Sequence, residues 1–408
     1  MSEASAGPLA GVKVVELGTL IAGPLCGRML ADFGAEVIKV EAPEGGDQIR
    51  QWRKMYPSTS SGQGAATSLW WYVQARNKKS VTLNLRSPEG QEIVRKLAKD
   101  ADVVIENFRP GALEKWNIGW PQLSQINSNL VMVRLSGFGQ DGPYRDRPGF
   151  GVVAEAMGGM RYVTGYTDRP PVRLGISIGD SIAALHGVIG AMMALHHRNV
   201  NGGKGQFVDV ALYEAVFNMM ESLIPEFDVL GFKRERAGNE LPGITPSNTY
   251  PTRDGKFVII GANNDSIFKR LMAAIGRADL AEDPTLATNT GRAPRARELD
   301  YAIETWTREH DLASLLETLE RAEVPSGRVY DAEDIVNDTH YAARRMIEQW
   351  KLPDGKPMKI PGIVPRLSET PGETRWLGPK LGEHTAEVLT RLGYGEAQQH
   401  ELRERGVI

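Results

Sequence analysis

Residues 12–43, VKVVELGTLIAGPLCGRMLADFGAEVIKVEAP, decide the fold of the chain. The run VKVVELG at residues 12–18 is short and apolar and ends in glycine, which is typical of a buried strand in a parallel sheet. A helix is expected over residues 24–33, and AEVIKVEAP from residue 35 repeats the strand pattern. Strand, helix and strand in this order indicate an α/β fold.

The sequence after this unit continues the alternation. Strand-like runs SVTLNL, DVVIENF, LVMVRLSGFG and GKGQFVDVAL follow, with helical segments between several of them, and together they predict a doubly wound sheet. A strand ending in Glu41 behind a glycine-bearing turn imitates a dinucleotide-binding unit. However, Gly18, Gly23 and Gly27 have the spacing GxxxxGxxxG instead of GxGxxG. The sequence therefore disfavours a nicotinamide or flavin enzyme.

A smaller α+β domain is expected later in the chain. Residues 234–251 carry Pro and Gly as a linker does, and the strand KFVIIGA and helices up to about residue 321 follow. We expect residues 1–225 to form the first part of the large domain and residues 226–330 the linker and small domain. Residues 331–408 return to the large domain and end in an extension, in which the proline-rich KLPDGKPMKIPGIVPRLS is expected to be extended.

The composition argues against several classes of function. The 408 residues are 41% hydrophobic and 24% charged, as in ordinary globular proteins, and the formal net charge is -3. Acidic and basic residues are mixed along the whole length, so no basic field is available to bind nucleic acid. The N-terminus lacks the pattern of a signal peptide, and no apolar run is expected to be long enough to cross a membrane.

Cysteine and histidine usage argue against a metal enzyme. Cys26 is the single cysteine, which fits a reducing compartment and so predicts a cytoplasmic protein. The seven histidines show neither HxH nor HExxH spacing, and the adjacent His196 and His197 point to different helix faces. No metal is therefore expected.

Asp180 is the residue that physical reasoning singles out for chemistry. The run LGISIGD places its carboxylate where a glycine-bearing extended segment meets the helix DSIAALHGVIGAMMALHHR, which is apolar nearly all round. The start of a helix offers backbone N–H groups and the positive end of the helix dipole. Aspartate is also a preferred helix N-cap, so the local sequence alone allows a purely structural role.

For the other candidate residues, a purely structural role stands beside the functional one. Cys26 and His186 lie in apolar helices, where a buried thiol and a hydrogen-bonded core histidine are expected. The aromatic cluster Trp70, Trp71 and Tyr72 favours core packing over ligand stacking. Arg109 in ENFRPG lies at the carboxyl edge of a strand, where α/β sheets bind ligands, and suits a phosphate. The run ARNKKS adds Arg76, Lys78 and Lys79 as a possible phosphate-facing rim or a solvated face.

Taken together, these segments resemble the class III CoA-transferase family, the formyl-CoA transferase and carnitine-CoA-transferase-like (CaiB/BaiF-type) proteins. The likeness covers nearly the whole chain and is carried by nine segments in order. They are GVKVVELGTLIAGPLCGRMLADFGAEVIKVEAP, RNKKSVTLNL, ADVVIENFRPG, LSGFGQDGPY, LGISIGDSIAALHGVIGAMMAL, GKGQFVDVAL, DPTLATNTGR, VPSGRVYDAEDI and LGEHTAEVL.

The resemblance implies a fold, a substrate and a nucleophile. It implies a Rossmann-like large domain made from both chain ends, a small domain between them, and an interlocked homodimer. It implies coenzyme A as substrate and product, an acyl-CoA donor and a carboxylic acid acceptor. Asp180 matches the family's catalytic aspartate, which forms an aspartyl anhydride and then an aspartyl-CoA thioester. The expected CoA contacts are Leu20, Ile21, Ala22, Arg76, Arg109, Lys115 and Ser136.

Departures from the family pattern limit the choice of substrate. Ile21 stands where formyl-CoA transferase has a glutamine, and GANND replaces its run of glycines, so formyl-CoA and oxalate are disfavoured. Phe150 stands where the related racemases have a histidine base, which leaves an acyl-CoA racemase or isomerase as the second reading. A non-catalytic acyl-CoA-binding relative is the third.

The expected donor is succinyl-CoA or a similar dicarboxyl-CoA, and the expected acceptor is a small dicarboxylic acid such as glutarate, malate or itaconate. This choice follows the family's common substrates. It also rests on Arg53, Arg147 and Arg173, which have the chemistry to bind a distal carboxylate in bidentate fashion.

Overall fold

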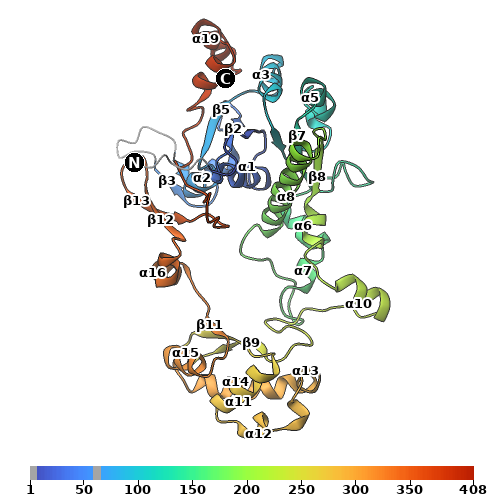
Figure 1. Ribbon diagram of the computed structural model, residues 1–408, viewed down its shortest axis with the longest axis vertical. Helices are drawn as coiled ribbons and strands as arrows, with labels where there is room; N and C mark the ends of the chain where they lie inside the picture. Colours follow the sequence, from blue (N-terminus) through green and yellow to red (C-terminus); the bar gives the residue numbers. More distant parts are fainter. Residues whose placement is uncertain (1–6, 58–65) are drawn as a thin grey trace. The chain divides into compact units, whose positions relative to one another are not determined.

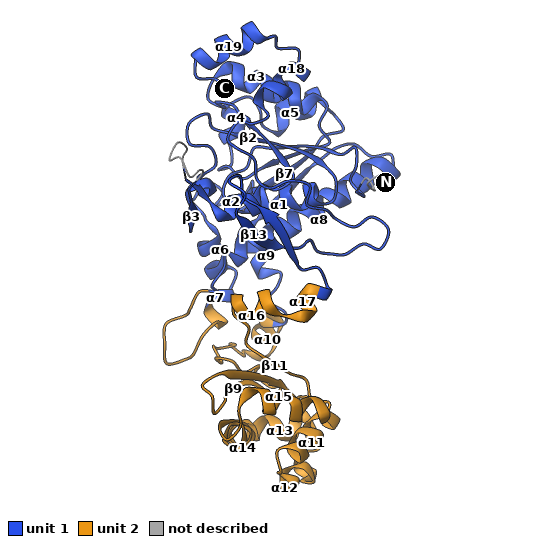
Figure 2. Ribbon diagram, turned by 90° about the vertical axis from the view of Figure 1, so that its left-hand side faces the viewer, with its two compact units in different colours: residues 1–161, 174–222, 343–408 blue, residues 162–173, 223–342 orange. Residues whose placement is uncertain are grey.

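The computed structural model describes residues 7–57 and 66–408. Residues 1–6, part of the stretch in which no signal peptide is expected, lie outside it. The chain divides into two compact units, shown in blue and orange in Figure 2. Unit 1 comprises Met1–Arg161, Leu174–Ser222 and Ala343–Ile408, and unit 2 comprises Tyr162–Arg173 and Leu223–Ala342. Both ends of the chain therefore belong to unit 1.

Three segments fall in a different unit from the expected one. Residues 162–173 and 223–225 belong to unit 2, although residues 1–225 were expected to stay together. The return to unit 1 comes after residue 342 instead of residue 330. The physical reason is that Arg328 forms an ion pair with Asp334 and the Tyr330 hydroxyl donates to Asp338, at 2.7 Å, so the segment after residue 330 is held to unit 2.

A six-stranded parallel sheet forms the centre of unit 1. Its strands are β1 (Lys13–Glu16), β2 (Glu36–Glu41), β5 (Lys78–Thr82), β6 (Val103–Glu106), β7 (Val131–Ser136) and β8 (Phe207–Ala211). They lie in the order β5-β2-β1-β6-β7-β8, with Val15 opposite Ile38 and Val104. The order reverses between β1 and β6, as in dinucleotide-binding folds. The expected α/β class with a parallel central sheet is confirmed.

Helices cover both faces of this sheet (Figure 1). Alternate strand residues face opposite sides: Val14 packs in the layer of α1 (Ala22–Asp32) and α8 (Ile178–Val200). Val15 faces the layer built from α3 (Pro88–Lys99), α5 (Trp120–Ile126), α18 (Thr385–Arg391) and α19 (Glu396–Glu404). Two apolar cores, one on each side, thus hold the strands in place.

The central helix α8 is longer than expected. Its 23 residues have the length and apolar composition that a bilayer-spanning helix needs, contrary to the expectation that no run is long enough. In unit 1 it packs against α1, α9 (Leu212–Phe217), β7 and β8, and Ala183, Ala184 and Ala191 are fully buried. Small residues along the buried face let the helix approach the sheet closely, which is typical of a core helix.

Shorter elements complete unit 1. They are α2 (Leu69–Gln74), α4 (Ala112–Lys115), α6 (Gly151–Met157), α7 (Met160–Val163, which crosses the unit boundary), the strand pair β3 (Met55–Tyr56) and β4 (Thr67–Ser68), and the hairpin β12 (Ile347–Lys351) and β13 (Pro357–Pro361). The proline-rich segment expected to be extended supplies the turn and the second strand of this hairpin. Its turn contains Asp354 and Gly355, and Gly355 has a φ of 87°, which glycine adopts without strain.

Unit 2 has its own core. A three-stranded antiparallel sheet of β9 (Ser247–Pro251), β10 (Phe257–Gly261) and β11 (Ser326–Arg328) buries Val258 and Ile260. The helices of this unit are α10 (Leu223–Leu230), α11 (Asp265–Ala274), α12 (Ala278–Ala281), α13 (Asn289–Arg292), α14 (Ala296–Arg308), α15 (Leu312–Arg321), α16 (Ala332–Asn337) and α17 (Thr339–Ala343). The strands and helices predicted for residues 256–328 therefore fold together.

Candidate active site

The strand order places a ligand-binding crevice at the carboxyl ends of β1 and β6. In open α/β sheets ligands bind where the strand order reverses, because the loops from neighbouring strands diverge there. After β1 the chain continues through residues 18–24, which include the first three residues of α1 and which we call the loop 18–24. After β6 it continues into ENFRPG. The Asn107 side chain joins the two, since it accepts from the Thr19 N–H at 2.8 Å and donates to the Thr19 carbonyl at 2.8 Å.

A cleft of about 580 Å³ opens at this edge of the sheet. Its walls are largely apolar and aromatic, and they include Leu17, Leu83, Phe108 and Trp116, with Arg86 at the rim. The carboxylates of Glu41, Glu44 and Asp47 also line the cleft. The apolar and aromatic part of the wall suits a flat ring such as a nucleobase, and Arg86 is the basic group that could meet a phosphate. The sequence analysis missed Arg86, although it follows the strand-like run VTLNL at the same sheet edge as Arg109.

Asp180 lies in the first turn of α8, where its carboxylate is partly buried. Its Oδ2 is so close to Gly151, in the first turn of α6, that a Cβ on Gly151 would overlap it. A Cβ on Gly179 would lie 3.0 Å from the Gly151 carbonyl oxygen. Two glycines therefore let the starts of α6 and α8 meet around one carboxylate, where the positive end of the helix dipole favours negative charge.

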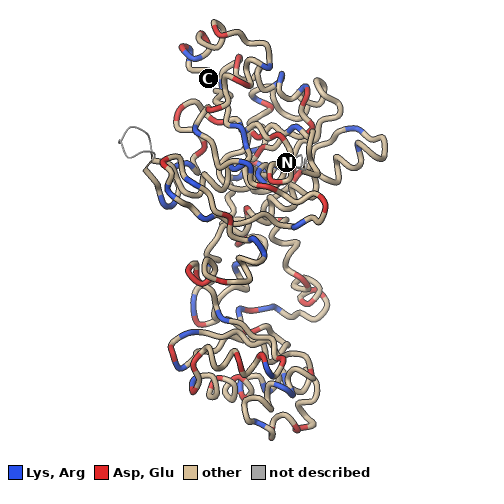
Figure 3. The backbone as a smooth tube through the Cα atoms, turned by 60° about the vertical axis from the view of Figure 1, so that its left-hand side comes forward, with Lys and Arg blue, Asp and Glu red and all other residues tan. Residues whose placement is uncertain are grey.

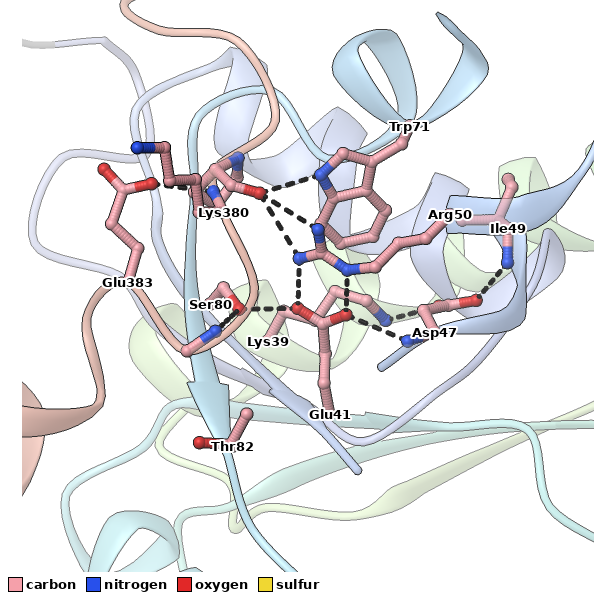
Figure 4. A network of polar contacts seen from close by, with 12 residues as sticks. Lys39, Glu41, Asp47, Ile49, Arg50, Trp71, Ser80, Thr82, Lys380 and Glu383 are labelled. Carbon is pink, nitrogen blue, oxygen red and sulfur yellow. Dashed lines mark hydrogen bonds and ion pairs between the residues drawn. The ribbon is translucent and has the colours of Figure 1, made fainter. Parts of the chain in front are cut away.

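Buried charges fix the chain beside the cleft (Figure 4). The Arg50 guanidinium donates to both carboxylate oxygens of Glu41, at 2.7 and 2.8 Å. It also lies 3.5 Å from the centre of the Trp71 ring. Ser80 Oγ donates to the same carboxylate at 2.6 Å. Burial opposes ionisation of Glu41, but the hydrogen bonds and charge of Arg50 hold the pKa of this carboxyl below its usual value. Glu41 is thus a fixed anion in the cleft wall.

A second buried cluster lies under the loop 18–24. Glu16 pairs with Lys39 at 3.0 Å and with Lys78 at 2.7 Å, and Lys39 also pairs with Asp47 at 2.8 Å. All four side chains are at most 1% exposed. Burial lowers the pKa of Lys78 to about 8, although the charge of Glu16 opposes the shift. Beyond such buried groups, charges of both signs alternate along the chain in both units (Figure 3).

The structure distributes the seven expected CoA contacts unevenly. Leu20 and Ile21 lie after β1 at the switch point, and Ala22 is the first residue of α1. Ile21 and Ala22 are buried, at 7% and 2% exposed, and Leu20 is partly buried. Arg109 and Lys115 are exposed at the start and end of the segment that follows β6. Ser136 ends β7 and is buried; its Oγ accepts from the Gly139 N–H at 3.0 Å.

Arg76 does not fit the expected role. It is 2% exposed, and its guanidinium pairs with both oxygens of Asp32 at 2.8 and 2.6 Å and donates to the Pro361 carbonyl at 2.7 Å. A guanidinium held inside the protein on both edges has no face left for a phosphate. Lys78 is buried as described above, and Lys79 pairs with Glu36 and Glu387. The run ARNKKS therefore forms no phosphate-facing rim.

The Arg76→Met variant tests this structural assignment. We expect its free energy of unfolding to fall by about 3 kcal/mol, because Asp32 would stay buried without its main partner. The KM for an acyl-CoA should remain unchanged, since Arg76 lies inside the protein. Urea unfolding and steady-state kinetics measure the two quantities. A large rise in KM at unchanged stability would restore the role in CoA binding.

The remaining candidates from the sequence have environments that suit structural roles. Cys26 is fully buried, and burial together with the charge of Glu16 raises the pKa of its thiol to about 12, so it is unsuited to nucleophilic attack. His186 forms a hydrogen bond with the Ile182 carbonyl at 2.9 Å. Trp71 packs in a core cluster with Ile49 and Tyr72.

The residues that bear on substrate choice are mostly exposed. The guanidinium of Arg53 lies 4.9 Å from the Trp70 ring centre and that of Arg147 3.6 Å from the Tyr144 ring centre, and both arginines are exposed, as is Arg173 in unit 2. Phe150 is 64% exposed at the N-cap of α6, next to Gly151. Within residues 7–57 and 66–408, His, Cys, Asp and Glu form no group of three suited to a metal ion.

Comparison with known proteins identifies the family of the chain. Residues 9–385 match CoA-transferase family III. The chain is 50% identical over 386 residues to the succinyl-CoA–D-citramalate CoA-transferase of Chloroflexus aurantiacus. These residues cover 94% of each chain. It is 42% identical over 405 residues to the beta subunit of the succinyl-CoA–L-malate CoA-transferase of the same organism, with 98% of each chain covered.

A solved structure gives the same result for the fold. A CaiB/BaiF family protein from Brucella suis superposes with a TM-score of 0.83 and 35% sequence identity, covering 95% of this chain and all of that one. A match from residue 9 to residue 385, two relatives above 40% identity and a shared fold are consistent with one another. The chain therefore belongs to the class III CoA-transferase family of enzymes.

Proposed function

We propose that this enzyme transfers CoA from succinyl-CoA to a small hydroxy- or dicarboxylic acid, with Asp180 as the covalent nucleophile. The observation that carries the proposal is the Asp180 carboxylate, which lies where the first turns of α6 and α8 meet. Two relatives at 50% and 42% identity are named as succinyl-CoA-dependent enzymes, one for D-citramalate and one for L-malate. Citramalate and malate are both small hydroxydicarboxylic acids, so this class is the preferred acceptor.

The proposed reaction consists of four acyl substitutions that involve the Asp180 carboxylate. One carboxylate oxygen attacks the donor carbonyl; the new C–O bond forms as the C–S bond breaks, which gives a mixed anhydride and CoA thiolate. The thiolate attacks the Asp180 carbonyl, forming aspartyl-CoA thioester and releasing succinate. The acceptor carboxylate then displaces the thiolate, and the thiolate attacks the acceptor carbonyl of the second anhydride. The Asp180 carboxylate is regenerated and no net proton transfer is needed.

The helix start supports each of these steps. Every substitution passes through a tetrahedral oxyanion, which fixed N–H donors stabilise. The N–H groups of Ile178 and Gly179 belong to the first turn of α8, where backbone N–H groups have no acceptor within the helix. Gly179 also carries no side chain that would screen them. The start of α8 would thus supply donors for the negative charge that develops.

The cleft at the sheet edge is the proposed site for the CoA nucleotide. Phe108 and Trp116 offer faces for adenine, while Arg86 lines the cleft and Arg109 and Lys115 are exposed on the adjoining segment with charge for the phosphates. From there the pantetheine arm would follow the loop with Leu20, Ile21 and Ala22. Ser136, buried at the end of β7, would act through its turn instead of through direct contact.

A homodimer in the cytoplasm is part of the proposal. Large apolar side chains are exposed on α8 of unit 1, where Met193 is 67% exposed. Others are exposed on α10 of unit 2, where Val229 is 76% and Leu230 is 75% exposed. Exposed apolar side chains of this size favour faces that a second copy covers. Light scattering should give about twice the 44.8 kDa mass of one chain. A monomer at micromolar concentration would contradict it.

The reaction is tested with succinyl-CoA and a panel of acids. We expect new CoA thioesters from citramalate or malate, detected by mass spectrometry, and a modified peptide that contains Asp180. A racemase would instead incorporate deuterium from heavy water into a chiral 2-methylacyl-CoA without an acceptor acid; Phe150 offers no base for this reaction. Hydrolysis of succinyl-CoA without transfer, or label without acceptor, would refute the proposal.

A further inference from the structure

The loop 18–24 is held by an unusually complete set of buried side chains. Lys39 Nζ donates to the Gly18 carbonyl at 2.8 Å, and Lys78 Nζ donates to the Pro24 carbonyl at 2.6 Å. Between these two ends, Asn107 bonds both the N–H and the carbonyl of Thr19, Asp47 accepts from the Leu20 N–H at 3.0 Å, and Gln74 donates to the Ile21 carbonyl at 3.2 Å. The loop therefore has little freedom to rearrange.

One residue of this loop is strained. Leu20 has a φ of 65°, a left-handed conformation that a branched side chain adopts at a cost. Such strain persists only where the surroundings over-determine the backbone, and it is concentrated at functional sites. Asp47 holds the N–H of Leu20 itself, and Asp47 is in turn paired with Lys39. The strained residue and the buried ions are thus one connected unit.

Stability alone does not account for this unit. Glu16, Lys39, Lys78 and Asp47 are all at most 1% exposed, and replacing buried ion pairs by apolar groups of similar size is often neutral or stabilising. The two lysines differ from ordinary ion-pair partners, because each also donates to one end of the same loop. The two lysines therefore fix the backbone of this loop as well as balance the buried carboxylates.

We propose that Lys39 and Lys78 are positioning residues, which hold the loop 18–24 in its strained form so that the acyl thioester lies in line with Asp180. The inference rests on the proposed function, in which this loop runs along the pantetheine arm. Holding reacting groups within a few tenths of an ångström is worth a large factor in rate. Neither lysine touches the substrate; both act through the backbone of the loop.

The test separates charge balance from loop anchoring. The single variant Lys78→Met leaves Glu16 with one cation, so it should lose stability. The double variant Glu16→Gln with Lys78→Met removes one charge of each sign and keeps the Lys39–Asp47 pair, so it should fold, yet the Pro24 carbonyl still lacks its donor. Gln74→Met, a third variant, removes the anchor of the Ile21 carbonyl without changing any charge.

We expect kcat for CoA transfer to fall about tenfold or more in the double variant and in Gln74→Met, with KM for succinyl-CoA changed less than about threefold. The matched control is Lys79→Met, the neighbour on β5 that pairs with Glu36 and Glu387 at the surface. It should keep the wild-type kcat. Circular dichroism and thermal unfolding check that each variant is folded.

The possible outcomes decide between the two proposals. Folded double and Gln74→Met variants with the wild-type kcat would overturn the positioning role and leave the proposed function intact. A loss of kcat in Lys79→Met equal to that in the double variant would also overturn it, since any lysine of the strand would then matter. A wild-type enzyme that transfers CoA to no acid would refute the proposed function itself.

Discussion

Replacing Asp180 by alanine or asparagine should lower the kcat of CoA transfer by about 10⁴-fold or more, because the reaction then has no carboxylate oxygen to form the anhydride. Binding of succinyl-CoA should remain within about threefold of wild type, since the proposed CoA contacts lie in the cleft and along the loop 18–24. Asparagine keeps the size of the side chain beside Gly151. A loss of activity in the asparagine variant therefore reports the missing carboxylate and not a change in packing. Single-turnover assays and isothermal titration with CoA measure the two effects.

A surface carboxylate provides the control for Asp180. Asp146 lies in the same unit and its side chain is 84% exposed beside Arg145, so Asp146→Asn should leave kcat unchanged. Mass spectrometry of wild-type enzyme quenched during turnover should find CoA or succinate on the peptide with Asp180 and not on the peptide with Asp146. Transfer in Asp180→Ala at more than about one tenth of the wild-type rate would exclude Asp180 as the nucleophile.

The sheet could be predicted from sequence because its signals are local. Val14 and Val15 lie in an apolar run that ends in Gly18, and the structure has β1 at Lys13–Glu16 inside the predicted residues 12–18. The helix predicted from residue 180 begins two residues earlier, at Ile178, and extends to Val200. The C-terminal hairpin was missed, although Asp354 and Gly355 form a recognised turn pair, because the surrounding prolines argued for extended chain.

The buried ions could not be predicted because their partners are far apart in sequence. Arg76 and Lys78 belong to a polar run that is typical of a solvated face, yet their acids are Asp32 and Glu16, about 44 and 62 positions earlier. Only the parallel pairing of β1, β2 and β5 brings these residues together. Charged residues in otherwise apolar strands, as at Glu16 and Lys39, were the local signs of buried ions.

Asp180 could be singled out from the sequence because two independent signals coincide there. The helix start is visible in the local sequence, and the family resemblance assigns the nucleophile to the same position. The close approach of Gly151 was not foreseen, since residue 151 is 29 positions away and its glycine has no marked local pattern. Packing of α6 against α8 creates this contact, so the surroundings of the proposed nucleophile are a tertiary property.

Gly151→Ala should lower kcat by about 10²-fold although the protein stays folded. The added methyl group would overlap Oδ2 of Asp180, and the carboxylate must turn or shift to make room. A displacement of about 1 Å at a reacting group costs a factor of this size. Alanine is the better helix former, so the change itself favours α6 and stability should not fall in step with the activity. Kinetics and thermal unfolding of the same preparation measure both.

Gly175→Ala is the matched control for this change. Gly175 precedes Asp180 by five residues, has an ordinary backbone conformation and has no atom within 4 Å of the position of a Cβ, so the variant should keep the wild-type kcat. Gly151→Ala with full activity would show that the carboxylate reacts from another rotamer. A large fall in Tm together with the loss of activity would instead show that Gly151 is needed for packing. A folded, slow Gly151→Ala enzyme that still binds succinyl-CoA leaves the orientation of one carboxylate as the cause, because the substitution changes neither charge nor the proposed CoA contacts.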